Sequence, residues 1–183
     1  KPMNIFRGWD NYVERLVSNW NRVVDPGDTV VIMGDVSWGM SLPEAYKDFE
    51  LLNSLPGKKI IMKGNHDYWW NTKKKMDEFF SKNKFETLSV LHNNAYRVGD
   101  ISICGTRGWF FDAESDLDKK VVKREAERLR RSIECGEKLG GEPVVFLHYP
   151  PINNLQICDT IYDVLVEKNI KRCYYAHLHS ASV

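Results

Sequence analysis

The sequence predicts an α/β fold in which helices cover mixed β-sheets. Short β-branched apolar runs typical of buried strands, such as 29–33, alternate with segments of helical periodicity, such as 9–24. Alternating strands and helices imply helices packed on a sheet. Two short strands around Gly99-Asp100 predict an antiparallel hairpin, which calls for a mixed sheet or a second sheet. We expect residues 1–183 to form a single domain.

Each element has its own local evidence. Apolar side chains recur at helical spacing between residues 9 and 24, and Pro26-Gly27 then breaks the pattern. The second predicted helix closes at Pro56-Gly57, and the longest closes at Gly140-Gly141. The predicted helices cover 9–24, 42–55, 71–82, 117–139 and 157–167. The predicted strands cover 29–33, 59–62, 96–98, 101–104, 143–147 and 172–175.

The composition is that of an ordinary globular chain, with 43% hydrophobic and 28% charged residues. The formal net charge of +1 gives no broad field that would favour nucleic acid or an anionic membrane. No apolar run approaches the ~20 residues that span a bilayer. The 4 cysteines contain no CxxC pair, which predicts free thiols, a reducing compartment and a cytoplasmic protein. Nothing in the sequence specifies an oligomeric state.

Polar residues follow the carboxyl ends of four predicted strands. They are Asp35, Asn65, His66, Asp67, His148, His177 and His179. If these strands are parallel neighbours, their ends lie along one edge, where α/β folds place ligand sites. Of the 5 histidines, only His92 lies elsewhere. We therefore expect the polar residues to converge on one site.

The residue types at these strand ends indicate a transition-metal site. Imidazole, carboxylate and amide oxygen together suit Mn, Fe, Zn, Co or Ni better than an all-oxygen Ca or Mg site, and we favour manganese. Because side chains alternate along a strand, His177 and His179 face the same side while Leu178 faces the other. Asp35 has two carboxylate oxygens with which to bridge two divalent ions.

These motifs resemble those of the calcineurin-like metallophosphoesterases. Gly34-Asp35, Gly64-Asn65-His66-Asp67, His148 and His177-Leu178-His179 match the ordered family motifs GD, GNH[DE], H and GHxH across most of the chain. The GNHD motif after an apolar run is the most specific of them. The resemblance implies a metallophosphoesterase-like sandwich of mixed β-sheets flanked by helices.

The resemblance also implies a role for each matching residue. One ion would be held by Asn65, His148 and His177, the other by His179, and Asp35 would bridge them. His66 would be the catalytic histidine beside the leaving group, oriented or tuned by Asp67. Such a binuclear centre supplies a metal-bound hydroxide and neutralises charge during phosphoryl transfer.

The chain departs from the family pattern at two points. Ala176 replaces the glycine of the last motif, a small change unless the backbone there needs a positive φ. No DxH motif precedes Gly34-Asp35. We therefore expect the fold to be incomplete at both ends, with a strand ending in Asp-x-His upstream of Lys1 and a further strand after Val183.

Arg107 is the candidate substrate contact outside the motifs. It directly follows a predicted strand and could present its guanidinium to a substrate phosphate. The alternative is a structural arginine packed on Trp109.

Three functions are compatible with these residues. The leading hypothesis is a metal-dependent hydrolase of small-molecule phosphomonoesters or phosphodiesters. The alternative is an inactive binding module of the same fold, although such a module has no chemical need for His66. A nuclease would need a basic groove, which the near-neutral charge does not indicate.

Overall fold

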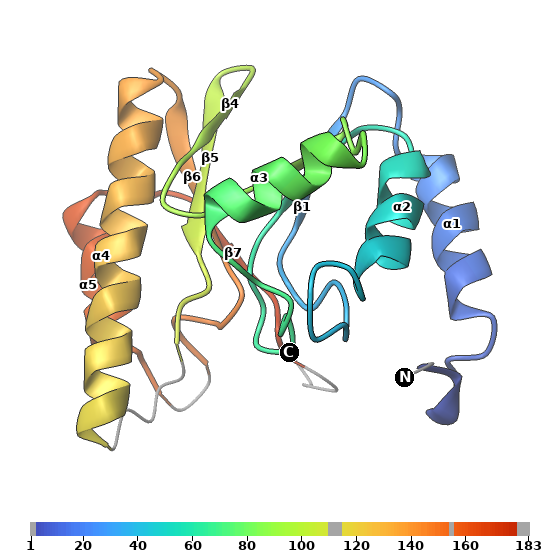
Figure 1. The fold of residues 1–183 in the computed structure, drawn as a ribbon. Coiled ribbons are helices and arrows are strands. Elements are labelled where there is room, and N and C mark those ends of the chain that lie inside the picture. Colours follow the sequence, from blue (N-terminus) through green and yellow to red (C-terminus); the bar gives the residue numbers. More distant parts are fainter. Residues whose placement is uncertain (1–2, 110–114, 154–155, 179–183) are drawn as a thin grey trace.

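The computed structural model describes residues 3–109, 115–153 and 156–178, which form two β-sheets with helices on their outer faces (Figure 1). The first sheet is parallel and has the order β1-β2-β3, with bounds β1 Thr29–Ile32, β2 Lys58–Ile61 and β3 Leu88–Val90. The second sheet has the order β4-β5-β6-β7, with bounds β4 Tyr96–Val98, β5 Ile101–Thr106, β6 Glu142–Leu147 and β7 Cys173–Tyr175. Its β4 and β5 form the antiparallel hairpin, and its other pairs are parallel.

The helices lie on opposite sides of the sheet pair. Their bounds are η1 Met3–Ile5, α1 Tyr12–Val23, α2 Tyr46–Ser54, α3 Lys73–Lys82, α4 Asp116–Lys138 and α5 Asp159–Glu167. In Figure 1, α4 and α5 stand beside the second sheet, while α1, α2 and α3 lie on the side of the first. The predicted α/β sandwich of two sheets flanked by helices is confirmed, with the second sheet mixed and the first parallel.

Three apolar clusters hold these layers together. Phe49 of α2 and Met76 of α3 pack under the first sheet with Trp69. Leu129 of α4 packs under the second sheet, in a cluster that includes residues of α5. The third cluster lies between the two sheets and contains Ile60, Met62, Leu91 and Ile103. Burial of apolar surface in all three clusters stabilises the sandwich.

Capping explains several helix boundaries. The Thr72 hydroxyl accepts a hydrogen bond from the Lys75 N–H at the start of α3, and Ser115 does the same for Asp118 at the start of α4. At the carboxyl end of α4, Gly140 adopts a positive φ of 80°, the conformation for which glycine is favoured.

The structure differs from the sequence-based expectation at three places. The helix expected over 42–55 begins only at Tyr46, because residues 42–45, with Pro43, form a turn. The strand β3 was not predicted, since its three residues carry too short a pattern. The four strands expected along one edge belong to two sheets, β1 and β2 to the first and β6 and β7 to the second. Their ends converge because the apolar faces of the sheets pack together.

No helix in the described part of the chain is long and apolar enough to cross a membrane. All four cysteines are free thiols, as expected, with Cys104 and Cys158 buried.

Candidate metal centre

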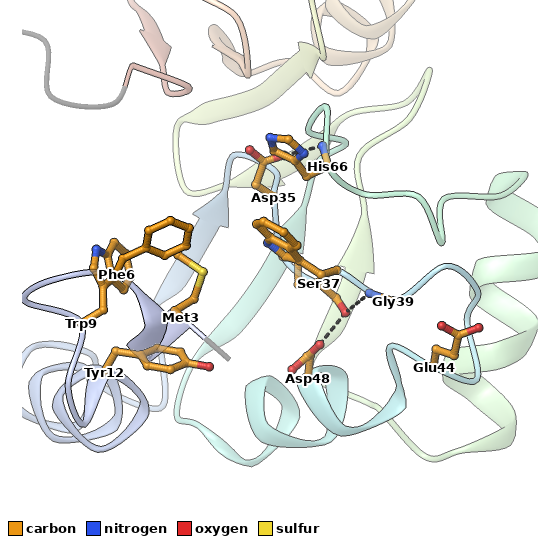
Figure 2. A pocket seen from close by; sticks show the side chains of 12 residues that line it. Met3, Phe6, Trp9, Tyr12, Asp35, Ser37, Gly39, Glu44, Asp48 and His66 are labelled. Carbon is orange, nitrogen blue, oxygen red and sulfur yellow. Dashed lines mark hydrogen bonds between the residues drawn. The ribbon is translucent and has the colours of Figure 1, made fainter. Parts of the chain in front are cut away.

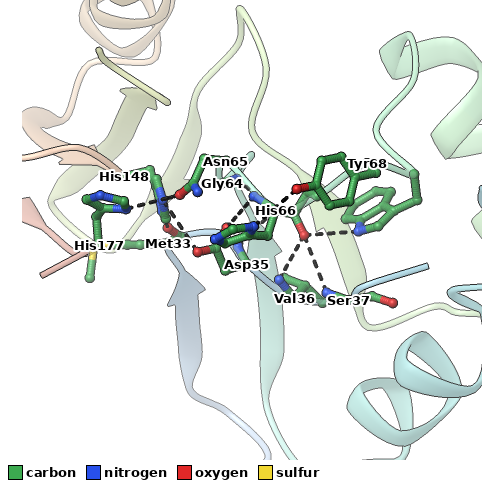
Figure 3. A network of polar contacts seen from close by, with 12 residues as sticks. Met33, Asp35, Val36, Ser37, Gly64, Asn65, His66, Tyr68, His148 and His177 are labelled. Atoms are coloured by element: carbon green, nitrogen blue, oxygen red, sulfur yellow. Dashed lines mark hydrogen bonds and ion pairs between the residues drawn. The ribbon is translucent and has the colours of Figure 1, made fainter. Parts of the chain in front are cut away.

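Two turns that follow β1 and β2 form one wall of the candidate site (Figure 3). Gly34, with φ 96°, lies so close to Gly64 that a Cβ atom on it would be 2.5 Å from the Gly64 Cα. A Cβ atom on Gly64 would be 2.1 Å from Oδ1 of Asp35. The glycines of both motifs are therefore required for the close approach of the two turns.

Asp67 joins these two turns through its carboxylate. Its Oδ2 accepts hydrogen bonds from the backbone N–H of Asp35 (2.8 Å) and of Gly64 (2.6 Å). Its Oδ1 accepts from the N–H of Val36 (2.8 Å) and from the indole N–H of Trp69 (3.0 Å). Burial raises the pKa of Asp67, and the backbone donors oppose that shift. The observed partners of Asp67 are thus backbone amides and Trp69 rather than the ring of His66, so its proposed tuning of His66 stays a prediction.

Asp35 occupies the centre of this wall. Its Oδ1 accepts a hydrogen bond from the backbone N–H of His66 (2.9 Å). In this bond the turn after β2 supplies the donor and the turn after β1 the acceptor. The Asp35 backbone lies in the left-handed region with φ 56°. A left-handed conformation at a non-glycine residue costs free energy and persists only where surrounding contacts impose it. Here those contacts are the hydrogen bond that the Asp35 N–H donates to Asp67 and the one that the Asp35 carboxylate accepts from the His66 N–H.

His148, directly after β6, reaches the same place from the second sheet. Its side chain is almost fully buried, at 2% exposure. Nδ1 lies 2.7 Å from the carbonyl oxygen of Met33, and since a carbonyl only accepts, Nδ1 carries the proton and donates it. In the neutral ring Nε2 then has a lone pair. This nitrogen points at Oδ1 of Asn65, 2.7 Å away.

Several acceptor atoms converge at this point. Nδ1 of His177 also lies 3.0 Å from Oδ1 of Asn65, and Nε2 of His148 lies 3.7 Å from Oδ2 of Asp35. The potential ligand atoms of Asp35, His148 and His177 all lie within 4.8 Å of one another. The donor set therefore fits a divalent transition-metal ion, and the Met33 carbonyl fixes His148 as metal-ligating histidines are commonly fixed.

The end of β7 brings His177 to the site with an unusual backbone. His177 has φ 68°, and it is this residue, not Ala176, that adopts the left-handed conformation. Alanine in place of the family glycine therefore meets no positive-φ strain. His179 lies outside the described residues, so its predicted role as a ligand stays a prediction.

His66 lies on the outer side of Asp35, between two aromatic side chains. Its ring stacks on Trp38 with a centroid separation of 5.6 Å and an interplanar angle of 14°. Its Nδ1 lies 3.3 Å from the hydroxyl of Tyr68. Sequence reasoning singled out neither aromatic residue, although both stand within three positions of a motif residue. Their position beside the GD and GNHD motifs was the feature of the sequence that could have identified them as site residues.

Arg107 lies at the end of β5, against Trp109. Its guanidinium carbon is 4.6 Å from the Trp109 ring centroid, and its Nη2 is 4.0 Å from the buried Glu125 carboxylate. Burial lowers the pKa of Arg107, opposed by the nearby Glu125. These contacts are those expected of a structural arginine packed on Trp109. A contact between Arg107 and substrate stays a prediction.

Tyr149 was also missed by sequence reasoning. Its ring lies 5.0 Å from the His148 ring and 4.6 Å from the His177 ring, centroid to centroid. Burial raises the pKa of its phenol. Tyr149 therefore forms an apolar wall beside the imidazoles and restricts their orientation.

The chain is similar to known proteins at the level of a family. A family model described as calcineurin-like phosphoesterase matches residues 5–181. The uncharacterized protein MJ1445 of Methanocaldococcus jannaschii is 42% identical over 52 residues, a match that covers 28% of each chain. The matched region thus spans less than a third of that relative. No solved structure matches the chain significantly.

Proposed function

Because this chain belongs to the calcineurin-like phosphoesterase family, we propose that it hydrolyses phosphomonoesters or phosphodiesters at a binuclear metal centre. The observation that carries this proposal is the convergence of Asp35, Asn65, His148 and His177, in which the potential ligand atoms of Asp35, His148 and His177 lie within 4.8 Å of one another and Oδ1 of Asn65 lies 2.7 Å from Nε2 of His148.

The ligands divide between two ions. Asn65, His148 and His177 would hold one ion and His179 the other, with Asp35 as the shared ligand, and manganese is the favoured metal. When bound, the two ions supply the activated water and neutralise charge on the phosphoryl group. The negative charge of the Asp35 carboxylate would reduce the repulsion between two cations bound beside it.

His66 acts on the leaving group. The bond between phosphorus and the leaving oxygen breaks as a new bond forms between phosphorus and the attacking oxygen. His66 donates a proton to the leaving oxygen, a step worth about 10²- to 10⁴-fold in rate. Trp38 and Tyr68 restrict the imidazole to the orientation in which it can donate.

The decisive experiment combines metal analysis with turnover. Protein purified without chelator is analysed for transition metals, and hydrolysis of aryl phosphate monoesters and diesters is assayed with added Mn²⁺. We expect close to two equivalents of metal and metal-dependent turnover. Absence of both, with every divalent ion tried, would contradict the proposal and support the binding module.

A further inference from the structure

A cleft opens beside Asp35 and His66, on the side away from His148. It has a volume of about 990 Å³, a size typical of small-molecule sites. Figure 2 shows Asp35 and His66 at one end of the cleft, with Phe6, Trp9 and Tyr12 grouped along one side. A phosphate ester at the metal centre would therefore extend its leaving group into this cleft, since His66 marks the leaving-group side.

The cleft is unusually aromatic. Phe6, Trp9 and Trp38 line it, and their exposed fractions are 48%, 46% and 44%. The edge of the Tyr12 ring packs against Trp9, at a centroid distance of 6.1 Å and an angle of 64°. Large exposed rings gathered in a concave surface indicate a binding site rather than scattered surface residues.

The segment that carries these rings has a defined shape. The N–H of Phe6 donates to the carbonyl of Met3 (3.0 Å), and the N–H of Trp9 donates to the carbonyl of Phe6 (3.2 Å). The Arg15 guanidinium of α1 donates to the carbonyl of Gly8 (2.9 Å). These bonds restrain the backbone of the segment whose Phe6 and Trp9 rings line the cleft, which lowers the ordering cost on binding.

The charge of the cleft is negative. Apart from Asp35, whose charge the metal ions would neutralise, Glu44 and Asp48 contribute carboxylates, and none of the described lining residues is a lysine or arginine. The Ser37 hydroxyl donates to Asp48, and the Met40 N–H donates to Glu44, so both carboxylates are held in place. A leaving group that carries a second phosphate would be repelled, whereas an uncharged ring with hydrogen-bond donors is compatible.

We propose that this cleft selects phosphate esters whose leaving group carries a flat, uncharged aromatic ring, such as the base of a nucleoside monophosphate. The proposal rests on the hydrolase function proposed above. The ring stacks on the aromatic side of the cleft, and stacking of this kind changes affinity by about 5- to 100-fold.

Paired substrates test this selectivity on the full chain with Mn²⁺. Adenosine 5′-monophosphate and ribose 5-phosphate share the leaving oxygen and differ in the base, while benzyl and butyl phosphate form the equivalent pair for a simple aryl ring. We expect kcat/KM to be about 10-fold higher for the aromatic member. Preference in the first pair alone identifies a nucleobase site, and preference in both pairs identifies a general aromatic site.

Point variants then test whether the aromatic side of the cleft causes this substrate preference. Trp9→Ala should lower kcat/KM for the aromatic member of each preferred pair until the ratio within the pair is close to one, and Trp9→Phe should restore part of that ratio. Tyr174→Ala is the matched control, because Tyr174 is an exposed ring (50%) on β7 that does not line the cleft. Equal kcat/KM values within both substrate pairs would overturn the proposal. So would a Trp9→Ala variant in which kcat/KM falls equally for the aromatic substrate and for its non-aromatic partner.

A binding measurement separates this proposal from the proposed chemistry. Adenosine alone should bind to the protein in equilibrium dialysis, and Trp9→Ala should weaken that binding by about 5- to 100-fold. If adenosine binds in this way but no ester is hydrolysed, the hydrolase function fails and the aromatic site stands. If esters are hydrolysed but adenosine does not bind, the aromatic site fails.

Discussion

The two walls of the metal centre are built by different physical means. The turns after β1 and β2 are joined by short-range hydrogen bonds, with the Asp67 carboxylate as their common acceptor. The wall from the second sheet meets the first through the hydrogen bond from His148 to the Met33 carbonyl and through the contacts of His148 and His177 with Asn65, and otherwise depends on packing. Hydrogen bonds and glycine contacts position Asp35 tightly, whereas His148 depends on these few polar contacts together with many small dispersion contacts.

The largest effect is expected at the bridging carboxylate. Asp35→Asn keeps an oxygen that can accept the His66 N–H but removes the charge between the two cations. Loss of several kcal/mol of charge stabilisation should lower kcat/KM by about 1,000-fold, with loss of bound metal. Elemental analysis and steady-state kinetics measure both, with Glu44→Gln as the control carboxylate in the adjoining cleft. Full activity of the Asp35→Asn variant would contradict the two-metal mechanism.

His66→Ala should separate chemistry from metal binding on the same wall. We expect kcat to fall about 100- to 1,000-fold for substrates with poor leaving groups, and less for good ones that need no proton. Metal content should stay at the wild-type level. A parallel fall in metal content and rate would show that His66 is a ligand, and its assignment as the proton donor would then be wrong.

Gly64→Ala tests whether the turn geometry positions Asp35. The added Cβ would be 2.1 Å from the Asp35 carboxylate, so the two turns must separate. A displacement of this kind costs up to about 100-fold in rate. Gly27→Ala is the control, because a Cβ there meets no atom within 4 Å. If Gly64→Ala and Gly27→Ala both retain wild-type kcat/KM, the close contact between the two turns does not position Asp35, and the contrast between the two walls is wrong.

Leu147→Ala should have the smallest effect on activity. Leu147 is fully buried in β6, immediately before His148. Its truncation should lower the free energy of unfolding by about 2–5 kcal/mol, measured by urea denaturation. Because the remaining contacts of the second sheet still support His148, metal content and kcat/KM should change little. A fall in kcat/KM as large as that in Gly64→Ala would show that single contacts position both walls alike.

The residues that can bind metal were predictable from the sequence because ligand chemistry is a property of side-chain type. Asp35, Asn65, His148 and His177 were identified from strand ends and motif order, and the structure brings them together. The partners of Asp67 were not predictable. Its donors include the backbone amides of residues 35 and 36. Because every residue except proline has a backbone N–H, the sequence does not show which of them will bind the carboxylate.

The sequence by itself determined the elements and the identities of the candidate ligands, because periodicity and residue type act locally. Only the tertiary structure decided that the strands divide between two sheets, and that the turns after β1 and β2 meet the end of β6. The bond from His148 to Met33 spans 115 residues of chain, and its formation depends on the packing of one sheet on the other. The aromatic cleft has the same origin, since Trp9 and Trp38 come from separate segments that only folding brings to one surface. Contacts of this range depend on how whole layers pack, which no local pattern encodes.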